Sequence, residues 1–338
     1  MRSQLHLGMA ICACAFFCLH VAGPLYHDRR WFVQDREAVA EVILTTPMPL
    51  PAKPDVVDEL YSNDINGVPS LFFNFIRKQV NCKGLWENAT VDAARDTPEP
   101  PVWIPDSMLD AFTYNGRVGV HQFAPTLFNQ VYLGGLAMEN VWTQEQVDDW
   151  ARQCGAGTLN GNYGVIETNW VREGLRHVPL ISGGRVLVIG SENPWVEACV
   201  LDAGAAQVTT LEYGKIVSQH PRIDTITPDQ MRASYDKYSE YFDSVVTFSS
   251  VEHAGLGRYG DAMNAYGDRQ AIARAWCATK PGGYLVIGVP VGADAIAYNA
   301  HRVYGPLMYS HLVANWEQVW RASSGGQVVH VLRKPERV

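Results

Sequence analysis

The sequence predicts a doubly wound α/β domain that ends in an antiparallel hairpin and follows an irregular N-terminal accessory region. Three observations predict this fold: a strand, glycine turn, helix and second strand within Arg185–Glu212, a regular alternation of strands and helices as far as Val289, and two strand-like runs near the C-terminal end. Alternating strands and helices form a parallel sheet with right-handed crossovers. Two short strands joined by a glycine-bearing turn form a hairpin.

The first unit has the pattern of a nucleotide-binding half domain. The apolar run Val186–Ile189 has the length of a strand covered on both faces, and Gly190 follows where the chain must turn. A helix is expected over 194–203, because its proline stands in the first turn, where a missing N–H costs nothing. A strand over 208–211 then leads to Glu212, whose carboxylate is placed to accept hydrogen bonds from ribose hydroxyls.

The remaining elements continue the alternation. We expect strands at 223–226, 244–248 and 284–289, a helix at 268–279, and the hairpin strands at 316–322 and 327–332. Asp268 is the expected N-cap of that helix. Lys280–Gly283 should make the turn into the strand at 284–289.

The chain divides into four parts. Residues 1–23 are a targeting segment, residues 24–60 a proline-rich stalk or linker, residues 61–180 the accessory region, and residues 181–338 the α/β domain. In the accessory region, Thr143–Gln146 resembles a capping box at the start of a helix. We expect this region to pack on the later domain.

The apolar run of residues 7–19 explains the first assignment. Its length suits the core of a signal peptide and is short for a membrane span, which needs roughly 20 residues. A cleaved signal peptide and an uncleaved membrane anchor both fit, and a buried N-terminal helix is the third alternative. The first two place the protein in the lumen of the secretory pathway, membrane-anchored or secreted. The sequon Asn88–Thr90 fits a glycoprotein.

Cysteine spacing argues against a metal site, because the chain has no CxxC motif. Cys199 and Cys277 fall on expected core-facing helices and are interpreted as buried thiols. Cys82 and Cys154 lie in the accessory region, where they either pair in a disulfide or stay free.

Composition and missing motifs exclude other classes. The formal charge of −8, without clusters of lysine and arginine, argues against nucleic-acid binding. The chain has neither a GxSxG elbow nor a P-loop lysine motif, so hydrolase and kinase functions have no support.

Residues 184–334 resemble the class I S-adenosylmethionine-dependent methyltransferases, whose sheet is Rossmann-like. The resemblance rests on the Gly190 turn, Glu212, the entry Phe242-Asp243 to a strand, and the turn Lys280–Gly283. It implies that S-adenosylmethionine is the cofactor and that Glu212 holds its ribose. The family usually has an acidic residue where this chain has Val188, and Glu192 is the candidate to replace it.

Longer blocks resemble an uncharacterised family of methyltransferase-like proteins. These blocks are GSENPWVEA (Gly190–Ala198), SSVEHAGLGRYGD (Ser249–Asp261), KPGGYLVIGVPVG (Lys280–Gly292) and NAHRVYG (Asn299–Gly305). Such long strings are specific to a family, but they imply no settled reaction.

Three sets of candidate site residues follow from these resemblances and positions. Cofactor-binding candidates are Gly190, Ser191, Glu192, Glu212, Ser249 and Ser250; catalytic candidates are His253, Glu252 and Asp261; substrate-binding candidates are Arg258, Tyr259, His301, Arg302 and Tyr304. A histidine suits proton transfer near neutrality, so His253 is the candidate base toward a hydroxyl. Glu252 contacts cofactor, orients His253 or fixes the loop. Arg258 either binds a carboxylate or phosphate or pairs with Asp261.

The function expected from the sequence is methyl transfer from S-adenosylmethionine to a small or glycan-like hydroxyl acceptor. A non-catalytic binding module of the same fold is the alternative, because the glycine turn lacks the usual further glycines. An NAD(P)-dependent oxidoreductase is a weaker alternative, against which the hairpin and the missing GxGxxG count.

Overall fold

A computed structural model of the protein describes residues 60–63, 69–76, 78–88, 99–122, 140–324 and 327–336. The expected targeting segment, all but the last residue of the expected stalk, and the sequon beyond Asn88 lie outside these residues. Within the described ranges, no helix is both long enough and apolar enough to cross a membrane.

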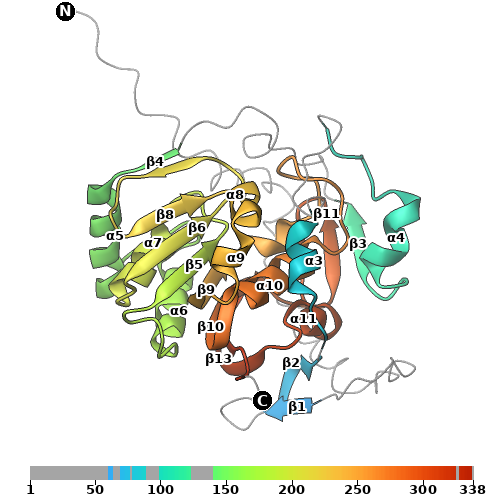
Figure 1. The fold of residues 1–338 in the computed structure, drawn as a ribbon. Coiled ribbons are helices and arrows are strands. Elements are labelled where there is room, and N and C mark those ends of the chain that lie inside the picture. Colours follow the sequence, from blue (N-terminus) through green and yellow to red (C-terminus); the bar gives the residue numbers. More distant parts are fainter. Residues whose placement is uncertain are drawn as a thin grey trace, which may run out of the picture. The chain divides into compact units, whose positions relative to one another are not determined.

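The main sheet has seven strands within the described residues, in the order β13-β14-β10-β9-β5-β6-β8 (Figure 1). The strands are β5 (Arg185–Ile189), β6 (Gln207–Leu211), β8 (Ile223–Ile226), β9 (Phe242–Phe248), β10 (Thr279–Pro290), β13 (Glu317–Ser324) and β14 (Gln327–Arg333). All pair in parallel except β14, which is antiparallel to both β10 and β13. Numbered along the chain, the order is 3-2-1-4-5-7-6, which confirms the doubly wound sheet with a terminal hairpin.

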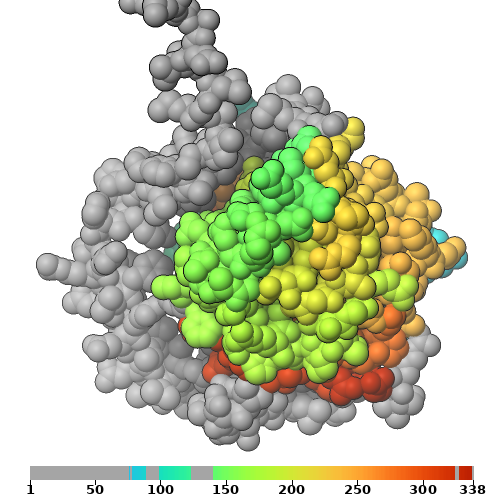
Figure 2. All heavy atoms as spheres, turned by 90° about the vertical axis from the view of Figure 1, so that its left-hand side faces the viewer, coloured from blue at the N-terminus to red at the C-terminus, as the bar shows by residue number. Residues whose placement is uncertain are grey.

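Helices cover both faces of this sheet. One face carries α5 (Gln144–Ala156), α6 (Val165–Arg176) and α7 (Trp195–Asp202), and the other carries α3 (Cys82–Glu87), α10 (Gly267–Ala278) and α11 (Pro306–Leu312). Figure 1 shows the first three helices on the left of the sheet, and Figure 2 shows the face that α5 and α6 form there in green.

The alternation of side chains along β5 explains this two-sided core. Leu187 packs in the cluster with α3, α10 and α11, whereas Val186 and Val188 pack in the cluster with α5, α6 and α7. Successive side chains of a strand point to opposite faces, so a continuous apolar run fits a strand covered on both sides. Each of these three side chains is at most 1% exposed, and such burial stabilises by about 1.5–3 kcal/mol per side chain.

The N-terminal cap expected from the sequence is confirmed for α5 and is wrong for α10. Thr143 caps α5, since its side chain accepts a hydrogen bond from the backbone N–H of Gln146, and Gly157 ends the helix in the left-handed conformation. Asp268 is not the cap of α10, as was expected. It lies inside the helix, 1% exposed, and accepts a hydrogen bond from the hydroxyl of Tyr304.

The accessory region pairs with strands of the later part of the chain. β3 (Gly119–Gln122) pairs in parallel with β11 (Ala295–Tyr298), which also pairs with β12 (His301–Val303). β4 (Asn140–Trp142) pairs in parallel with β7 (Ile216–Ser218). The remaining elements are β1 (Leu60–Asn63), β2 (Pro69–Phe75), α4 (Asp106–Thr113), α8 (Pro228–Ala233), α9 (Tyr235–Tyr238) and the 3-10 helix η2 (Val251–His253).

Two disulfides also join the accessory helices to the helices of the sheet. Cys82 of α3 is bonded to Cys277 of α10, and Cys154 of α5 is bonded to Cys199 of α7. Cys82 and Cys154 are therefore neither paired with each other nor free, and the interpretation of Cys199 and Cys277 as buried thiols is wrong. In each disulfide, the helix of the accessory cysteine packs against the helix of its partner cysteine. The two disulfides lie on opposite faces of the sheet.

Candidate functional site

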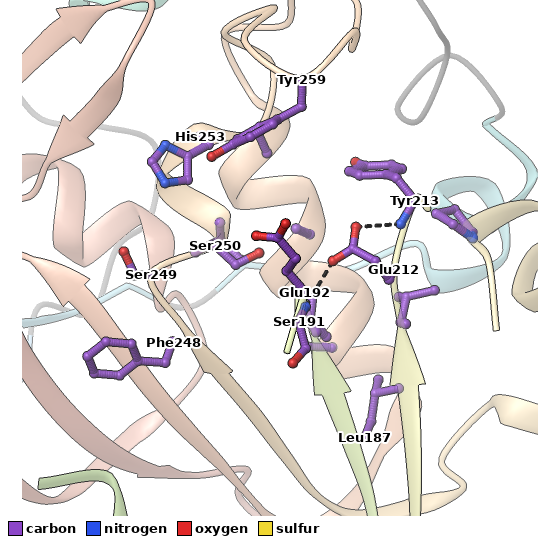
Figure 3. A pocket seen from close by; sticks show the side chains of 18 of the residues that line it. Leu187, Ser191, Glu192, Glu212, Tyr213, Phe248, Ser249, Ser250, His253 and Tyr259 are labelled. Carbon is purple, nitrogen blue, oxygen red and sulfur yellow. Dashed lines mark hydrogen bonds between the residues drawn. The ribbon is translucent and has the colours of Figure 1, made fainter. Parts of the chain in front are cut away.

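A cavity of about 190 Å³ opens at the carboxyl ends of β5, β6 and β9. Ligands of doubly wound sheets bind at this edge. The cavity brings together nine of the candidates named from the sequence: Gly190, Ser191, Glu192, Glu212, Ser249, Ser250, His253, Tyr259 and Asp261. Figure 3 labels all of these except Gly190 and Asp261.

Gly190 makes the turn that ends β5. Its φ of +74° lies in the left-handed region, and a Cβ at this position would overlap the side chain of Ser250 in the loop after β9. The glycine therefore lets two loops of the cavity approach each other.

Glu212 follows β6 directly and holds the same turn. Its Oε2 accepts a hydrogen bond from the backbone N–H of Ser191 at 2.9 Å, and its Oε1 accepts one from the backbone N–H of Tyr213 at 2.6 Å, as the dashed lines of Figure 3 show. Burial, reinforced by the nearby charge of Glu192, raises the pKa of Glu212 to about 7. A carboxylate has about four acceptor positions, so it keeps capacity for a ligand hydroxyl.

Glu192 lines the cavity beside Glu212, and its backbone is fixed from the accessory region. Its carbonyl accepts hydrogen bonds from Asn140 Nδ2 and from Trp142 Nε1 at 3.2 Å, both on β4. The turn after β5 is thus held by the accessory strand as well as by Glu212.

Glu197 is a buried carboxyl group that the sequence reading missed. It lies in the first turn of α7, 0% exposed, with Oε1 accepting from Thr210 Oγ1 at 2.8 Å and Oε2 lying 2.9 Å from Ser191 Oγ. Burial raises its pKa to about 7. In its protonated form it donates to Ser191 Oγ, which in turn donates to the carbonyl of Asn193. A carboxylate inside the apolar run of this helix was the available signal.

Glu252 does not line the cavity, which corrects its placement among the catalytic candidates. It is 1% exposed, and its Oε1 accepts a hydrogen bond from Ser249 Oγ at 2.6 Å. Burial raises its pKa to about 7. Ser249 has a positive φ of 47°, so this hydrogen bond holds a turn that is costly for a residue with a side chain. This contact fits the loop-fixing role among the three considered for Glu252, whose Oε1 also lies 3.8 Å from Nε2 of His253.

His253 presents a neutral imidazole to the cavity. Its Nδ1 donates to the carbonyl of Ala300 at 2.6 Å, which makes Nε2 the acceptor nitrogen. Burial, followed by the positive charge of Arg258, lowers the pKa of His253 to about 3. The ring meets Tyr259 edge to face, with centroids 5.5 Å apart (Figure 3).

Asp261 lines the cavity and organises the glycine loop. Its Oδ2 accepts hydrogen bonds from the backbone N–H groups of Gly255 at 2.7 Å and Gly257 at 3.2 Å, and its Oδ1 accepts one from Tyr259 at 3.2 Å. Both carboxylate oxygens are thus engaged with the backbone.

Arg302 and Tyr304 are buried and do not line the cavity, so their expected substrate contacts are wrong. Arg302 donates to the carbonyls of Glu252, Ala254 and Asn264 and lies 3.6 Å from Asp268. Tyr304 donates to the same aspartate at 3.0 Å. These contacts satisfy a buried guanidinium and anchor the loop that carries His253.

Arg258 and His301 lie near the cavity without lining it. Arg258 Nη1 donates to the carbonyl of Ala300 at 3.4 Å, and the ring of His301 lies 6.4 Å from that of His253. Burial and the charge of Arg258 lower the pKa of His301. Of the two alternatives for Arg258, the ion pair with Asp261 is not among the contacts of the described residues.

Three aromatic rings that the sequence reading did not single out form one wall of the cavity. The ring centroid of Tyr163, just before α6, lies 5.2 Å from that of Phe248. The ring of Trp195 meets that of Phe248 edge to face, with centroids 5.3 Å apart. These residues are far apart in the sequence, and only the topology brings them together.

Comparisons with known proteins give one family match and several similar solved structures. Residues 183–333 match the family described as "Caenorhabditis protein of unknown function, DUF268". No curated protein matches the chain. Among solved structures, the chain is similar to N-methyltransferase NodS from Bradyrhizobium japonicum WM9 (17% identity, TM-score 0.35, covering 50% of this chain and 97% of that one). It is also similar to 1,6-didemethyltoxoflavin-N1-methyltransferase from Burkholderia thailandensis, with bound 1,6-didemethyltoxoflavin and S-adenosylhomocysteine (13% identity, TM-score 0.36, covering 72% and 95%).

Proposed function

We propose that the protein binds S-adenosylmethionine and transfers its methyl group to a hydroxyl acceptor, a function that its doubly wound sheet with a terminal hairpin supports and that the match of residues 183–333 to a family of unknown function leaves open. One observation carries the proposal. The glycine turn after β5 and the carboxylate after β6 face one cavity and are joined by the hydrogen bond from Ser191 to Glu212.

The residues of the cavity fit this cofactor chemically. Glu212 keeps acceptor capacity for ribose hydroxyls, and Gly190 lets the turn after β5 approach Ser250 closely at the edge of the cavity. Glu192 and Glu212 give the cavity a negative potential, which favours a ligand that carries a sulfonium and an ammonium group.

Bound S-adenosylmethionine would supply an electrophilic methyl group. The protein's own contribution is to place an acceptor hydroxyl and to take its proton. His253 holds Nε2 as a hydrogen-bond acceptor, because Ala300 fixes the proton on Nδ1. Tyr163, Trp195 and Phe248 give the cavity an apolar wall against which an acceptor could be placed, and positioning would carry most of the catalysis.

The proposed acceptor is a small or glycan-like molecule in the secretory pathway. The targeting segment expected from the sequence supports this location. The two disulfides support it as well, since disulfides persist in oxidising compartments.

The test is calorimetric titration of the full chain with S-adenosylmethionine and S-adenosylhomocysteine. Glu212→Gln removes the charge at nearly constant shape and should weaken binding at least about tenfold. Glu145→Gln, on the exposed first turn of α5, is the matched control and should leave binding unchanged.

Other outcomes would overturn the proposal. A folded protein that binds neither compound would favour the non-catalytic module. Binding of NAD(P) in their place would favour the oxidoreductase. Equal weakening by both glutamate variants would show a general charge effect rather than a contact at Glu212.

A further inference from the structure

A second cavity, of about 440 Å³, lies between residues 78–88, α10 and α11. We call it the cationic pocket. Its polar lining includes Lys78, Asn81, Asn88, Arg269, His311 and Asn315, and no aspartate or glutamate is among the described residues that line it. This composition is opposite to that of the first cavity, where carboxylates dominate.

Two basic side chains and a histidine lie along this pocket. Lys78 Nζ donates to Nδ1 of His311 at 3.0 Å. The guanidinium of Arg269 lies over two aromatic rings, with Cζ 4.9 Å from the centroid of Tyr114 and 4.4 Å from that of Tyr266. Arg269 Nε is buried and has no hydrogen-bond partner within the described structure.

The positive charges act on one another. Burial and then the charge of Arg269 lower the pKa of Lys78. The pKa of His311 is lowered to about 4 by burial and then by the positive charges of Lys78, Arg269 and Arg117. Each positive charge therefore disfavours the charged form of its neighbours, a cost that a bound anion would offset.

The position of Lys78 is set by the fold. The side chain of Asn315, at the end of the α11 segment, accepts a hydrogen bond from the backbone N–H of Lys78 at 2.5 Å and donates one to its carbonyl at 2.9 Å. This paired contact spans 237 residues of sequence. Arg269 is held in turn by its two aromatic neighbours, so the backbone of Lys78 and the guanidinium of Arg269 are both fixed in place.

We propose that the cationic pocket binds the anionic oxygen group of a ligand, that is, a sulfate, phosphate or carboxylate group. Lys78 and Arg269 supply the charges, and Arg269 also supplies a donor that lacks a partner. The asparagine side chains along the pocket offer further donors to the oxygens. The site is distinct from the first cavity, and its binding does not require the proposed methyl transfer.

The test is calorimetric titration of the full chain with sodium sulfate, sodium phosphate and sodium glucuronate at constant ionic strength. Lys78→Gln and Arg269→Gln should each weaken binding of the preferred anion at least about tenfold. Lys83→Gln removes the same charge from an exposed position on α3, where Lys83 is 75% exposed, and should leave the affinity unchanged. The anion that binds most tightly identifies the group.

Two controls keep the result clear. Glu212→Gln should retain anion binding, which separates this pocket from the proposed cofactor site. Thermal unfolding without ligand checks that the Lys78 and Arg269 variants are folded. If Arg269→Gln does not fold, the anion affinity of Lys78→Gln alone tests the proposal. The proposal is wrong if none of the three anions binds at millimolar concentration, or if Lys83→Gln weakens binding as much as Lys78→Gln does.

Discussion

Gly190 and Ser250 are in direct contact across the cavity, so close that a Cβ on the glycine would lie 1.8 Å from Ser250 Oγ. The turn after β5 and the loop after β9 therefore have interdependent shapes. Any side chain at position 190 forces one of the two loops to move.

Gly190→Ala should destabilise the protein and weaken cofactor binding. Gly183→Ala is the matched control, because Gly183 has nearly the same φ, +73°, but nothing lies within 4 Å of its added Cβ. The left-handed conformation costs alanine about 1–2 kcal/mol at both positions. Urea unfolding and calorimetric titration should show a larger stability loss, and a loss of affinity, at position 190 alone. Equal effects of the two variants would contradict the close contact.

Glu197→Gln should change how stability depends on pH. The pKa of Glu197 in the folded protein, about 7, lies above its ordinary value of 4.5, so its contribution to stability is full below pH 4.5 and is lost as the pH rises through 7. Glutamine imitates the protonated acid and does not titrate. The variant should match the wild type near pH 5 and exceed it at pH 8, with a slope difference of at most about 1.4 kcal/mol per pH unit. Urea unfolding at several pH values measures this, and parallel curves would contradict it.

The affinity for S-adenosylhomocysteine should rise between pH 6 and pH 8. The pKa of Glu212 is raised to about 7, and the ionised carboxylate is the better acceptor for ribose hydroxyls. Each pH unit below 7 should weaken binding by up to about tenfold. Calorimetry over this range should show a shallower dependence for Glu212→Gln. A wild-type curve identical to that of the variant would exclude Glu212 as the titrating group.

His253→Ala should lower methyl transfer at least about a hundredfold while the dissociation constant of S-adenosylhomocysteine changes little. The reason is that, in the proposed function, Nε2 of His253 would act on the acceptor, whereas Ser191 and Glu212 would hold the cofactor. With a pKa of about 3, His253 stays neutral from pH 5 to 8, so its own titration should not appear in the rate profile over that range. Equal losses of turnover and cofactor affinity would exclude the base role.

Peptide mapping without reduction should recover Cys82 linked to Cys277 and Cys154 linked to Cys199. Removing the first disulfide by Cys82→Ser should cost about 1 kcal/mol more than removing the second by Cys154→Ser, because it closes a loop of 195 residues against 45. Thermal unfolding compares the two variants. A peptide that links Cys82 to Cys154 would contradict the structure.

The sequence predicts well the sheet and the meeting of the glycine turn with the carboxylate after β6, because both depend on local patterns. Val186–Ile189 is an unbroken apolar run, and Gly190 and Glu212 stand at fixed distances from it, so their meeting follows from the strand order alone. The roles of Arg302 and Tyr304 were not predictable in this way. Their partner Asp268 lies on another element, and a buried ion pair has no signature in spacing.

The disulfides and the cationic pocket could not be predicted from the sequence either. Cys82 and Cys277 are 195 residues apart, and the contact between Lys78 and Asn315 spans 237. Such pairings depend on how the accessory region folds back on the domain, which no local period records. Glu197 is different: a carboxylate among apolar residues of α7 was visible in the sequence and marked a buried acid.

The two disulfides make the chain a ring within a ring, since Cys154 and Cys199 both lie between Cys82 and Cys277. A protease that cuts once anywhere between residues 83 and 276 leaves every atom of the protein covalently connected. The nicked molecule keeps its mass apart from an added water and separates into two pieces only after reduction. A single backbone cleavage in this range therefore leaves the two fragments joined by a disulfide.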